Sequence, residues 1–326
     1  MVQLSGQTKD NDVPVKKLFL SVGAMKAGTT FMFNALSTHP QIFMLPEKEL
    51  HFFAHVDGFN PDLYKAGNYA LQLAVRFKLR EYYNAHAPEP FPRLKEILSF
   101  DFRRHRLSAV MHNRFAKLED AEAVRAIVRW YADRYLTSPI DDAWFDRVYE
   151  AAGDRWASDF SNYNAILSDS GWERAKRLSE QLKVVYFLRE PVDRLWSHVK
   201  FDLVQAGEGH VLDTLDEKVL IDILANRQIT THGRYDAIIT NLRRHLTDDQ
   251  LMVTTLEDTV SDFTGQMQKL EAFLGIDNAD YSRIDPARKA NKGVERPVPE
   301  HIRELLAQSI PEEDMAAYQA AVNGAL

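Results

Sequence analysis

The stretch KLFLSVGAMKAGTTFMFNALSTHPQIFMLPEKELHFF, residues 17–53, decides the fold. Residues 18–22 form an apolar run that predicts a buried strand, and the helix that follows opens at Thr29-Thr30. Between them lies a turn with two glycines and Lys26. Such a turn binds anions, because backbone N–H groups and the helix dipole point outward at the helix start. Lys26 adds a full positive charge, so the sequence predicts a phosphate-binding turn.

The spacing in this turn differs from that of a Walker A loop, GxxxxGK[ST], in which the lysine follows the second glycine. Here the segment Gly23-Ala24-Met25-Lys26-Ala27-Gly28-Thr29-Thr30 keeps both glycines but places the lysine before Gly28. That arrangement resembles the 5′-phosphosulfate loop of sulfotransferases that use 3′-phosphoadenosine 5′-phosphosulfate (PAPS), whose usual form is KxGTT or KxGxT. The resemblance implies that the donor is held by Lys26, Ala27, Gly28, Thr29 and Thr30.

A second motif follows the apolar run at residues 183–188, KVVYFL, which is typical of a parallel strand buried on both faces. The run ends in Arg189, and Pro191 suits the first turn of a helix. The string FLREPVDRLWSH is similar to the 3′-phosphate motif of sulfotransferases, which implies that Arg189 and Ser197 bind that phosphate. Without the Lys26 loop, an ordinary ion pair and a surface hydroxyl would be the simpler interpretation.

The segment PEKELHFF, residues 46–53, is similar to the KExHFF stretch of bacterial and heparan-type sulfotransferases. The resemblance implies that Glu49 is the catalytic base and that His51 is its partner or a competing base. Residues i and i+2 of an extended segment share a face, so both side chains can point the same way. Lys48 is expected to point elsewhere, toward the sulfate or a structural carboxylate. The alternative is a solvated turn followed by a core histidine.

Three further segments complete the resemblance, which covers residues 17–53, 155–204 and 232–310. Residues 155–163 predict a strand that runs into a helix capped by Asp159 or Ser161. Ser161 and Tyr163 correspond to a family segment that faces the active site.

Residues 250–258 predict another buried strand that ends in the acidic pair Glu257-Asp258, followed by a helix from Phe263 to Leu274 that closes at Gly275. The loop around Lys292 and Gly293 resembles one that folds over the 3′-phosphate and adenine.

Together these segments predict an α/β fold of the three-layer, P-loop-like kind, with a central parallel sheet flanked by helices and a helical insertion. Ligands bind such sheets at the carboxyl ends of the strands, where both Lys26 and Arg189 lie. A ligand with two separated phosphate-like groups can contact both. PAPS is such a ligand, and its sulfuryl group would pass in line to an acceptor hydroxyl while PAP leaves.

Composition excludes several other classes. The chain has 326 residues, 45% of them hydrophobic, no cysteine and a net charge of −7. Disulfides, thiolate catalysis and cysteine-ligated zinc are therefore excluded, and nucleic acid is not an expected partner. No apolar run approaches the roughly 18 residues of a membrane span. Residues 1–16 are a polar tail without a signal-peptide pattern, so we expect a cytoplasmic, bacterial protein.

We expect one sulfotransferase domain over residues 1–326, with a helical insertion over the acceptor side at about residues 54–153. No metal is expected, and the oligomeric state is open. The acceptor is a carbohydrate, a lipid or another small molecule with a hydroxyl group.

Two alternatives stay open. A P-loop kinase or NTPase would need a Mg²⁺-binding acid at a strand end, for which Glu257-Asp258 is the candidate. The other is a nucleotide-binding module without catalysis.

Overall fold

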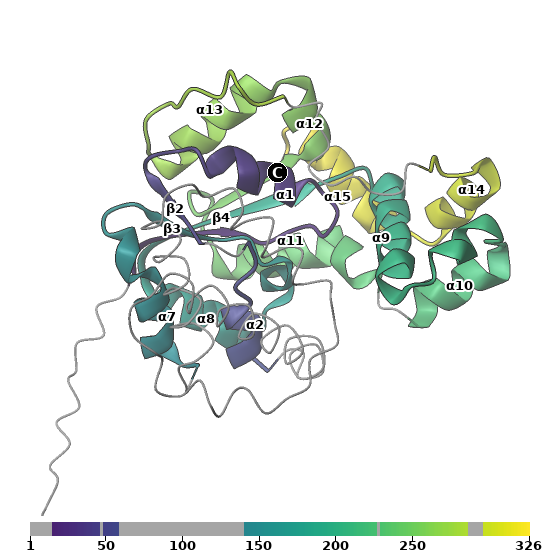
Figure 1. The fold of residues 1–326 in the computed structure, drawn as a ribbon, viewed down its shortest axis with the longest axis horizontal. Helices are drawn as coiled ribbons and strands as arrows, with labels where there is room; N and C mark the ends of the chain where they lie inside the picture. The colour runs from purple at the N-terminus through teal and green to yellow at the C-terminus, as the bar shows by residue number, and fades with distance from the viewer. Residues whose placement is uncertain (1–14, 46–47, 59–139, 227–228, 286–295) are drawn as a thin grey trace, which may run out of the picture. The chain divides into compact units, whose positions relative to one another are not determined.

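The computed structural model describes residues 15–45, 48–58, 140–226, 229–285 and 296–326 (Figure 1). In chain order the elements are β1 (Val15–Ser21), α1 (Thr29–Leu36), β2 (Ile42–Met44), α2 (Phe52–Val56), α7 (Asp142–Tyr149), η2 (Glu150–Ala152), β3 (Trp156–Asp159), η3 (Asn162–Ile166), α8 (Asp169–Arg177), β4 (Ser179–Leu188), α9 (Pro191–Ala206), η4 (Gly209–Asp213), α10 (Glu217–Asn226), η5 (Thr231–Gly233), α11 (Tyr235–His245), β5 (Leu251–Thr255), α12 (Leu256–Ser261), α13 (Phe263–Leu274), α14 (Glu300–Gln308) and α15 (Glu312–Val322), where η marks a 3₁₀ helix.

The centre of the fold is a five-stranded parallel sheet in the order β2-β3-β1-β4-β5. From β1 the chain first builds β2 and β3 on one side, and β4 and β5 then extend the sheet on the other. The order therefore reverses between β1 and β4, and such a switch point opens a crevice at the carboxyl ends of the strands. The predicted α/β class with a central parallel sheet is confirmed.

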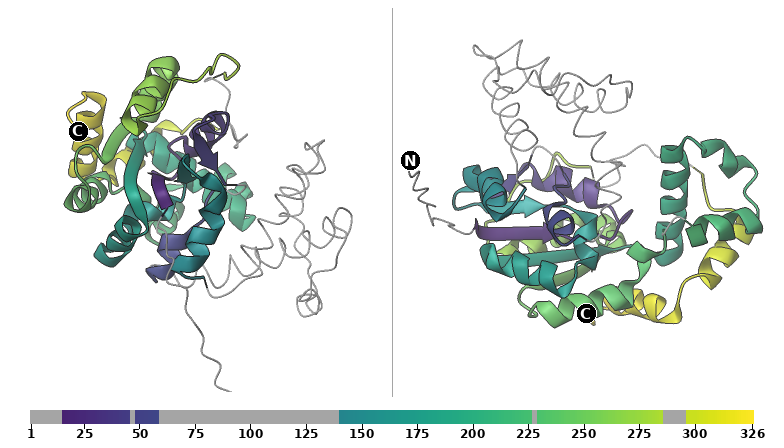
Figure 2. Two further views of the ribbon diagram at one scale, coloured as in Figure 1. Left: turned by 90° about the vertical axis from the view of Figure 1, so that its left-hand side faces the viewer. Right: turned by 90° about the horizontal axis from the view of Figure 1, so that it is seen from below.

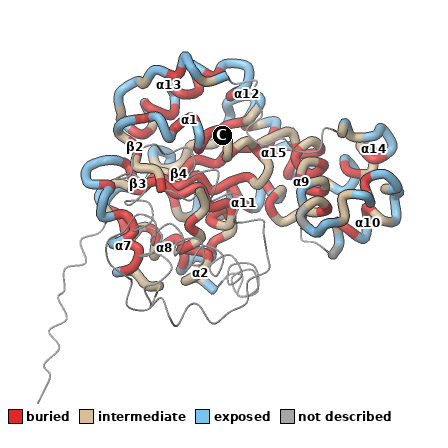
Figure 3. The backbone as a smooth tube through the Cα atoms, in the orientation of Figure 1, coloured by how far each residue is buried: buried red, intermediate tan, exposed pale blue. Residues whose placement is uncertain are grey.

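Helices cover both faces of this sheet, with α1 and α13 on one face and α8 and α11 on the other (Figure 1). The helices α11 and α15 lie side by side (Figure 2). The inner strands are buried in their carboxyl-terminal parts (Figure 3), where both of their faces lie under helices: β1 is buried from Leu18 onward, and β3 over its whole length. The residues of β4 from Val184 to Leu188 are at most 2% exposed, which explains their continuous apolar sequence.

A second apolar cluster lies beyond the carboxyl end of β4, between α9, α10 and α14 (Figure 1). Its members include Leu195, Trp196 and Val199 of α9 and Ile302 and Leu306 of α14. The helix α9 begins as predicted at Pro191, and the Glu190 side chain caps it by accepting hydrogen bonds from the N–H groups of Val192 and Asp193. This packing makes α9 a rigid support for the residues that follow Arg189.

The chain forms two compact units. One comprises residues 16–57 and 154–326 and contains the sheet, and the other comprises residues 1–15 and 58–153, of which α7 and η2 are described. The insertion predicted at about residues 54–153 falls mainly in the second unit, and residues 59–139 lie outside the described residues. Its placement over the acceptor, like the single-domain interpretation, stays a prediction.

Two local predictions were wrong. Neither Asp159 nor Ser161 caps η3 with its side chain, because the Ser161 hydroxyl donates to the Asp159 carboxylate instead. The strand β5 ends at Thr255, so Glu257 and Asp258 lie in the first turn of α12 rather than at a strand end. The helix α13 does span Phe263–Leu274, and Gly275 follows it in the left-handed conformation. In the described part of the chain, no helix is both long and apolar enough to cross a membrane.

Candidate active site

The loops that follow β1 and β4 lie against each other at the switch point of the sheet. Backbone hydrogen bonds continue the pairing of the two strands past β1, from Ala24 N to Phe187 O and from Phe187 N to Gly23 O. Beyond them, the Arg189 guanidinium donates from Nη1 to the carbonyl oxygen of Lys26 at 3.3 Å. The two predicted anion-binding motifs, separated by more than 160 residues, are therefore one site.

The loop after β1 turns sharply into α1. Lys26 and Gly28 both have positive φ angles, 73° and 81°. Glycine is favoured at position 28 because φ is positive there, and a Cβ would also lie 2.5 Å from Cδ1 of Leu256, which would have to move. No described side chain caps the start of α1, and its first turn contains no acidic residue. A helix N-terminus of this kind suits an anion.

Lys26 is the charged group of this loop. Burial, followed by the nearby charges of Lys48 and Arg189, lowers the pKa of Lys26 to about 8. Its Nζ lies 4.2 Å from the centre of the Phe201 ring, on α9. The charge of Glu49 offsets the repulsion among Lys26, Lys48 and Arg189 only in part, because the pKa of Lys26 is still lowered, so a bound anion would relieve the rest.

The segment after β2 brings Lys48, Glu49 and His51 together beside this loop. The Glu49 carboxylate pairs with His51 Nε2 through Oε2 at 3.1 Å, and its Oε1 accepts from Lys48 Nζ at 2.8 Å. Asn162 Nδ2 donates to the same Oε1 at 3.0 Å. Lys48 Nζ also donates to the Thr29 hydroxyl at 3.0 Å. Lys48 therefore contacts Glu49, which was not expected, and at the same time Thr29 of the loop after β1.

Glu49 and His51 pair as predicted, but they do not do so by sharing one face of an extended segment. His51 has φ 56°, in the left-handed region, so the segment is not extended there. Burial alone would raise the pKa of Glu49, but the charges of Lys48 and His51 outweigh it and hold the value at about 2. Burial opposes the charged form of His51, yet its hydrogen bond with Glu49 raises the pKa of this histidine.

The buried carboxylate of Asp159, at the end of β3, holds this segment in place. It accepts hydrogen bonds from Leu50 N at 3.0 Å, from the Ser161 hydroxyl at 2.6 Å and from Asn164 Nδ2 at 3.0 Å. Ser161 Oγ in turn accepts from His51 N at 2.8 Å. Burial raises the pKa of Asp159. The Ser161 expected near the active site is thus a support of the base segment.

A row of rings leads away from the base and was not predicted. His51 contacts Tyr163 edge to face at a centroid distance of 5.5 Å, Tyr163 contacts His232 at 5.0 Å, and His232 lies 6.1 Å from His198. Burial, then the charge of Arg194, lowers the pKa of His198 to about 3 and that of His232 to about 4, so both are neutral at physiological pH. His198 is the last residue of the FLREPVDRLWSH string, but that motif implied no role for it, and His232 belongs to no recognisable motif.

The other predicted residues have different outcomes. Ser197 is half-buried in the second turn of α9, after Arg189, and its side chain has no hydrogen bond with another described residue. Lys292 and Gly293 lie outside the described residues. Glu257 accepts a hydrogen bond from Glu190 N at 3.0 Å and lies in α12, a position that does not match a strand-end Mg²⁺ ligand. Among the described residues, no group of three histidine or acidic side chains could hold a metal ion.

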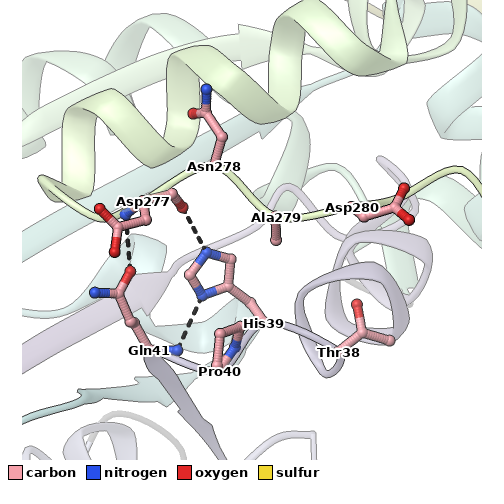
Figure 4. Close-up of a pocket in the computed structure, with 8 residues that line it drawn as sticks. All are labelled: Thr38, His39, Pro40, Gln41, Asp277, Asn278, Ala279 and Asp280. Carbon is pink, nitrogen blue, oxygen red and sulfur yellow. Dashed lines mark hydrogen bonds between the residues drawn. The ribbon is translucent and has the colours of Figure 1, made fainter.

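A separate cavity of about 320 Å³ lies just before the start of β2 (Figure 4). It is therefore near the amino-terminal end of a strand, whereas Lys26 follows the carboxyl end of β1. The His39 ring on its wall is fully bonded, because Nδ1 accepts from Gln41 N at 3.1 Å and Nε2 lies 2.9 Å from the Asp277 carbonyl oxygen. This histidine therefore joins two segments of the fold and has no free nitrogen for a ligand.

Comparison with known proteins agrees with this geometry. The model of the sulfotransferase family matches residues 19–280, so the chain belongs to this family and is a sulfotransferase-family enzyme. No curated protein matches the chain.

Among solved structures, a sulfotransferase from Alicyclobacillus acidocaldarius is 19% identical, with 95% of this chain and 96% of that chain covered and a TM-score of 0.52. The sulfotransferase domain of the Synechococcus PCC 7002 olefin synthase is 16% identical, with 98% of each chain covered and a TM-score of 0.47. The sulfotransferase domain of the curacin biosynthetic pathway is 17% identical, with 94% and 97% covered and a TM-score of 0.49. The likeness to the first of these shows the fold.

Proposed function

We propose that the chain transfers the sulfuryl group of PAPS to a hydroxyl group of a carbohydrate, a lipid or another small molecule and releases PAP. The observation that carries this proposal is the contact between Arg189 and the Lys26 loop, beside the Glu49 carboxylate. Two cationic loops suit a donor with two anionic ends, and a carboxylate near one of them suits the acceptor proton.

Each group then has a defined task. The N–H groups at the start of α1, with Thr29 and Thr30, hold the 5′-phosphosulfate, and Arg189 with Ser197 holds the 3′-phosphate. Lys292 and Gly293 are proposed to complete the nucleotide site on the basis of the sequence alone.

Glu49 takes the proton of the acceptor hydroxyl as its oxygen bonds to sulfur. The bond from sulfur to the phosphate oxygen breaks, and Lys26 stabilises the charge that builds on that oxygen. No step requires a metal.

Thermal shift experiments test the donor. PAP should stabilise the protein more than ADP or ATP with Mg²⁺, because only PAP carries the 3′-phosphate. Equal stabilisation by ATP with Mg²⁺ would favour a kinase or NTPase instead. A screen of labelled PAPS against sugars, lipid alcohols, phenols and carrier-bound hydroxyacyl groups then identifies the acceptor class, and transfer to none of them, despite PAP binding, would favour a module without catalysis.

A further inference from the structure

Lys48 joins the donor side of the site to the base. Its Nζ donates to the hydroxyl of Thr29, the first residue of α1, and to Oε1 of Glu49. Thr29 belongs to the loop assigned to the donor, and Glu49 is the group assigned to the acceptor proton. The Lys48 side chain is 16% exposed and the Glu49 side chain 31%, so the pair lies at the wall of the site rather than in free solvent.

In this arrangement Glu49 is a weak base. The carboxylate is engaged by Lys48, His51 and Asn162 together, and a carboxylate held by two cations accepts a proton poorly. If donor binding drew one of these cations away from Glu49, the carboxylate would become a stronger base. This would happen only when a sulfuryl group is present to be transferred.

We propose that Lys48 is a positioning residue that couples donor binding to the base, because the sulfuryl oxygens held beside Thr29 draw its ammonium away from Glu49. The inference rests on the proposed function. Lysine suits this task, since its ammonium is a point charge on a flexible stem. A ligand can shift a side chain only if it interacts differently with the two positions of that side chain. Here the sulfuryl group would attract the Lys48 ammonium when it lies beside the donor and not when it lies at Glu49.

The remaining groups around Glu49 keep it in place during this change. Asn162 on η3 still donates to Oε1 and His51 still pairs with Oε2. The other titratable groups that face the pair are Lys26 of the donor loop, Asp159 of β3, Tyr163 of η3 and His232 of η5. Unlike these groups, Lys48 contacts both Glu49 and the donor loop.

The pKa of His51 reports the position of Lys48, because the Lys48 charge lowers it. It can be measured by NMR on histidine-labelled protein without any acceptor, with the His51 resonance assigned by its loss in His51→Gln. The ligands compared are PAP, which lacks the sulfuryl group, and PAPS. In the natural protein PAPS should raise the pKa of His51 by about one unit more than PAP, the effect of a unit charge moving a few ångströms away.

In Lys48→Met the pKa of His51 should already be raised in the ligand-free protein. PAP and PAPS should then change this pKa by the same amount. Lys48→Gln serves as a second neutral variant if the methionine variant folds poorly. Lys176→Met is a matched control, since Lys176 pairs with Glu173 at 3.1 Å on the surface of α8 and should leave both responses unchanged. Equal effects of PAP and PAPS in the natural protein would overturn the inference alone. Failure of both nucleotides to bind would overturn the proposed function with it.

Discussion

The Lys26 ammonium lies over the face of the Phe201 ring, 4.2 Å from its centre. Phe201 is 36% exposed on α9, and a contact of this kind stabilises the charged lysine by about 1 kcal/mol. Because the proposed role of Lys26 is to meet charge on the leaving phosphate, the ammonium must exchange the ring for the nucleotide.

Phe201→Leu should therefore bind PAP about fivefold more tightly at about pH 6, where Lys26 is charged and has no ring contact to lose. The pKa of Lys26 is lowered to about 8, so at about pH 9.5 the free lysine is neutral in both proteins. There the two affinities should be equal. Calorimetry at the two pH values measures this, with Phe201→Tyr as the control that keeps the ring. Weaker binding by the leucine variant at both pH values would mean that the ring contacts the nucleotide.

Lys26→Ala should lower kcat by about 10²–10³-fold and weaken PAP binding less, since the backbone N–H groups of the loop are unchanged. Lys26 must be protonated to act, so the rate of the natural enzyme should fall as the pH rises above about 8. Lys26→Arg should remove this alkaline limb, because arginine stays charged. Single-turnover rates across the pH range decide, and a near-normal kcat in the alanine variant would exclude the leaving-group role.

Arg189→Ala should abolish the preference for PAP over adenosine 5′-phosphate, because the charge-assisted bond to the 3′-phosphate is lost. Arg189→Lys should keep part of the preference, since it retains the charge without the planar fork. Calorimetric titration with both nucleotides gives the ratio. An unchanged ratio in Arg189→Ala would place the 3′-phosphate elsewhere.

Glu49→Gln should lower kcat by about 10²–10⁴-fold, the usual effect of losing a general base, and His51→Ala should lower it less. The pH profile separates the two candidates. The pKa of Glu49 is about 2, so glutamate as base gives no acidic limb above about pH 4. Histidine as base would give an acidic limb at higher pH, because its hydrogen bond with Glu49 raises the pKa of His51 above the ordinary value. A larger loss in His51→Ala, with that limb abolished, would make the histidine the base.

Asp159→Ala should lower the free energy of unfolding by roughly 3 kcal/mol, because the buried donors of Leu50, Ser161 and Asn164 lose their acceptor. Urea denaturation measures the change. Asp154→Ala is the matched control, since Asp154 is 86% exposed and its pair with Lys16 should contribute almost nothing. A similar small effect at both positions would show that Asp159 does not hold the base segment.

The two anion-binding motifs could be predicted from the sequence because each depends on local structure. An apolar strand, a turn with glycines and a helix start follow one another around Lys26, and at Arg189 an apolar strand is followed directly by a helix that starts at Pro191. The parallel sheet followed from the alternation of strands and helices. The cap predicted at Asp159 or Ser161 failed because a distant segment, that of Leu50 and His51, competes for these side chains.

What the sequence by itself determined is therefore the class of fold, the two cationic loops and the set of residues available to act as base. The tertiary structure decided how these groups interact: that Arg189 meets the Lys26 loop, that Lys48 bridges Thr29 and Glu49, and that the pKa of Glu49 falls although burial alone would raise it. The reason is physical. Strand and helix formation depend on neighbouring residues, whereas hydrogen bonds, burial and electrostatic energies depend on distances between segments that only folding brings together.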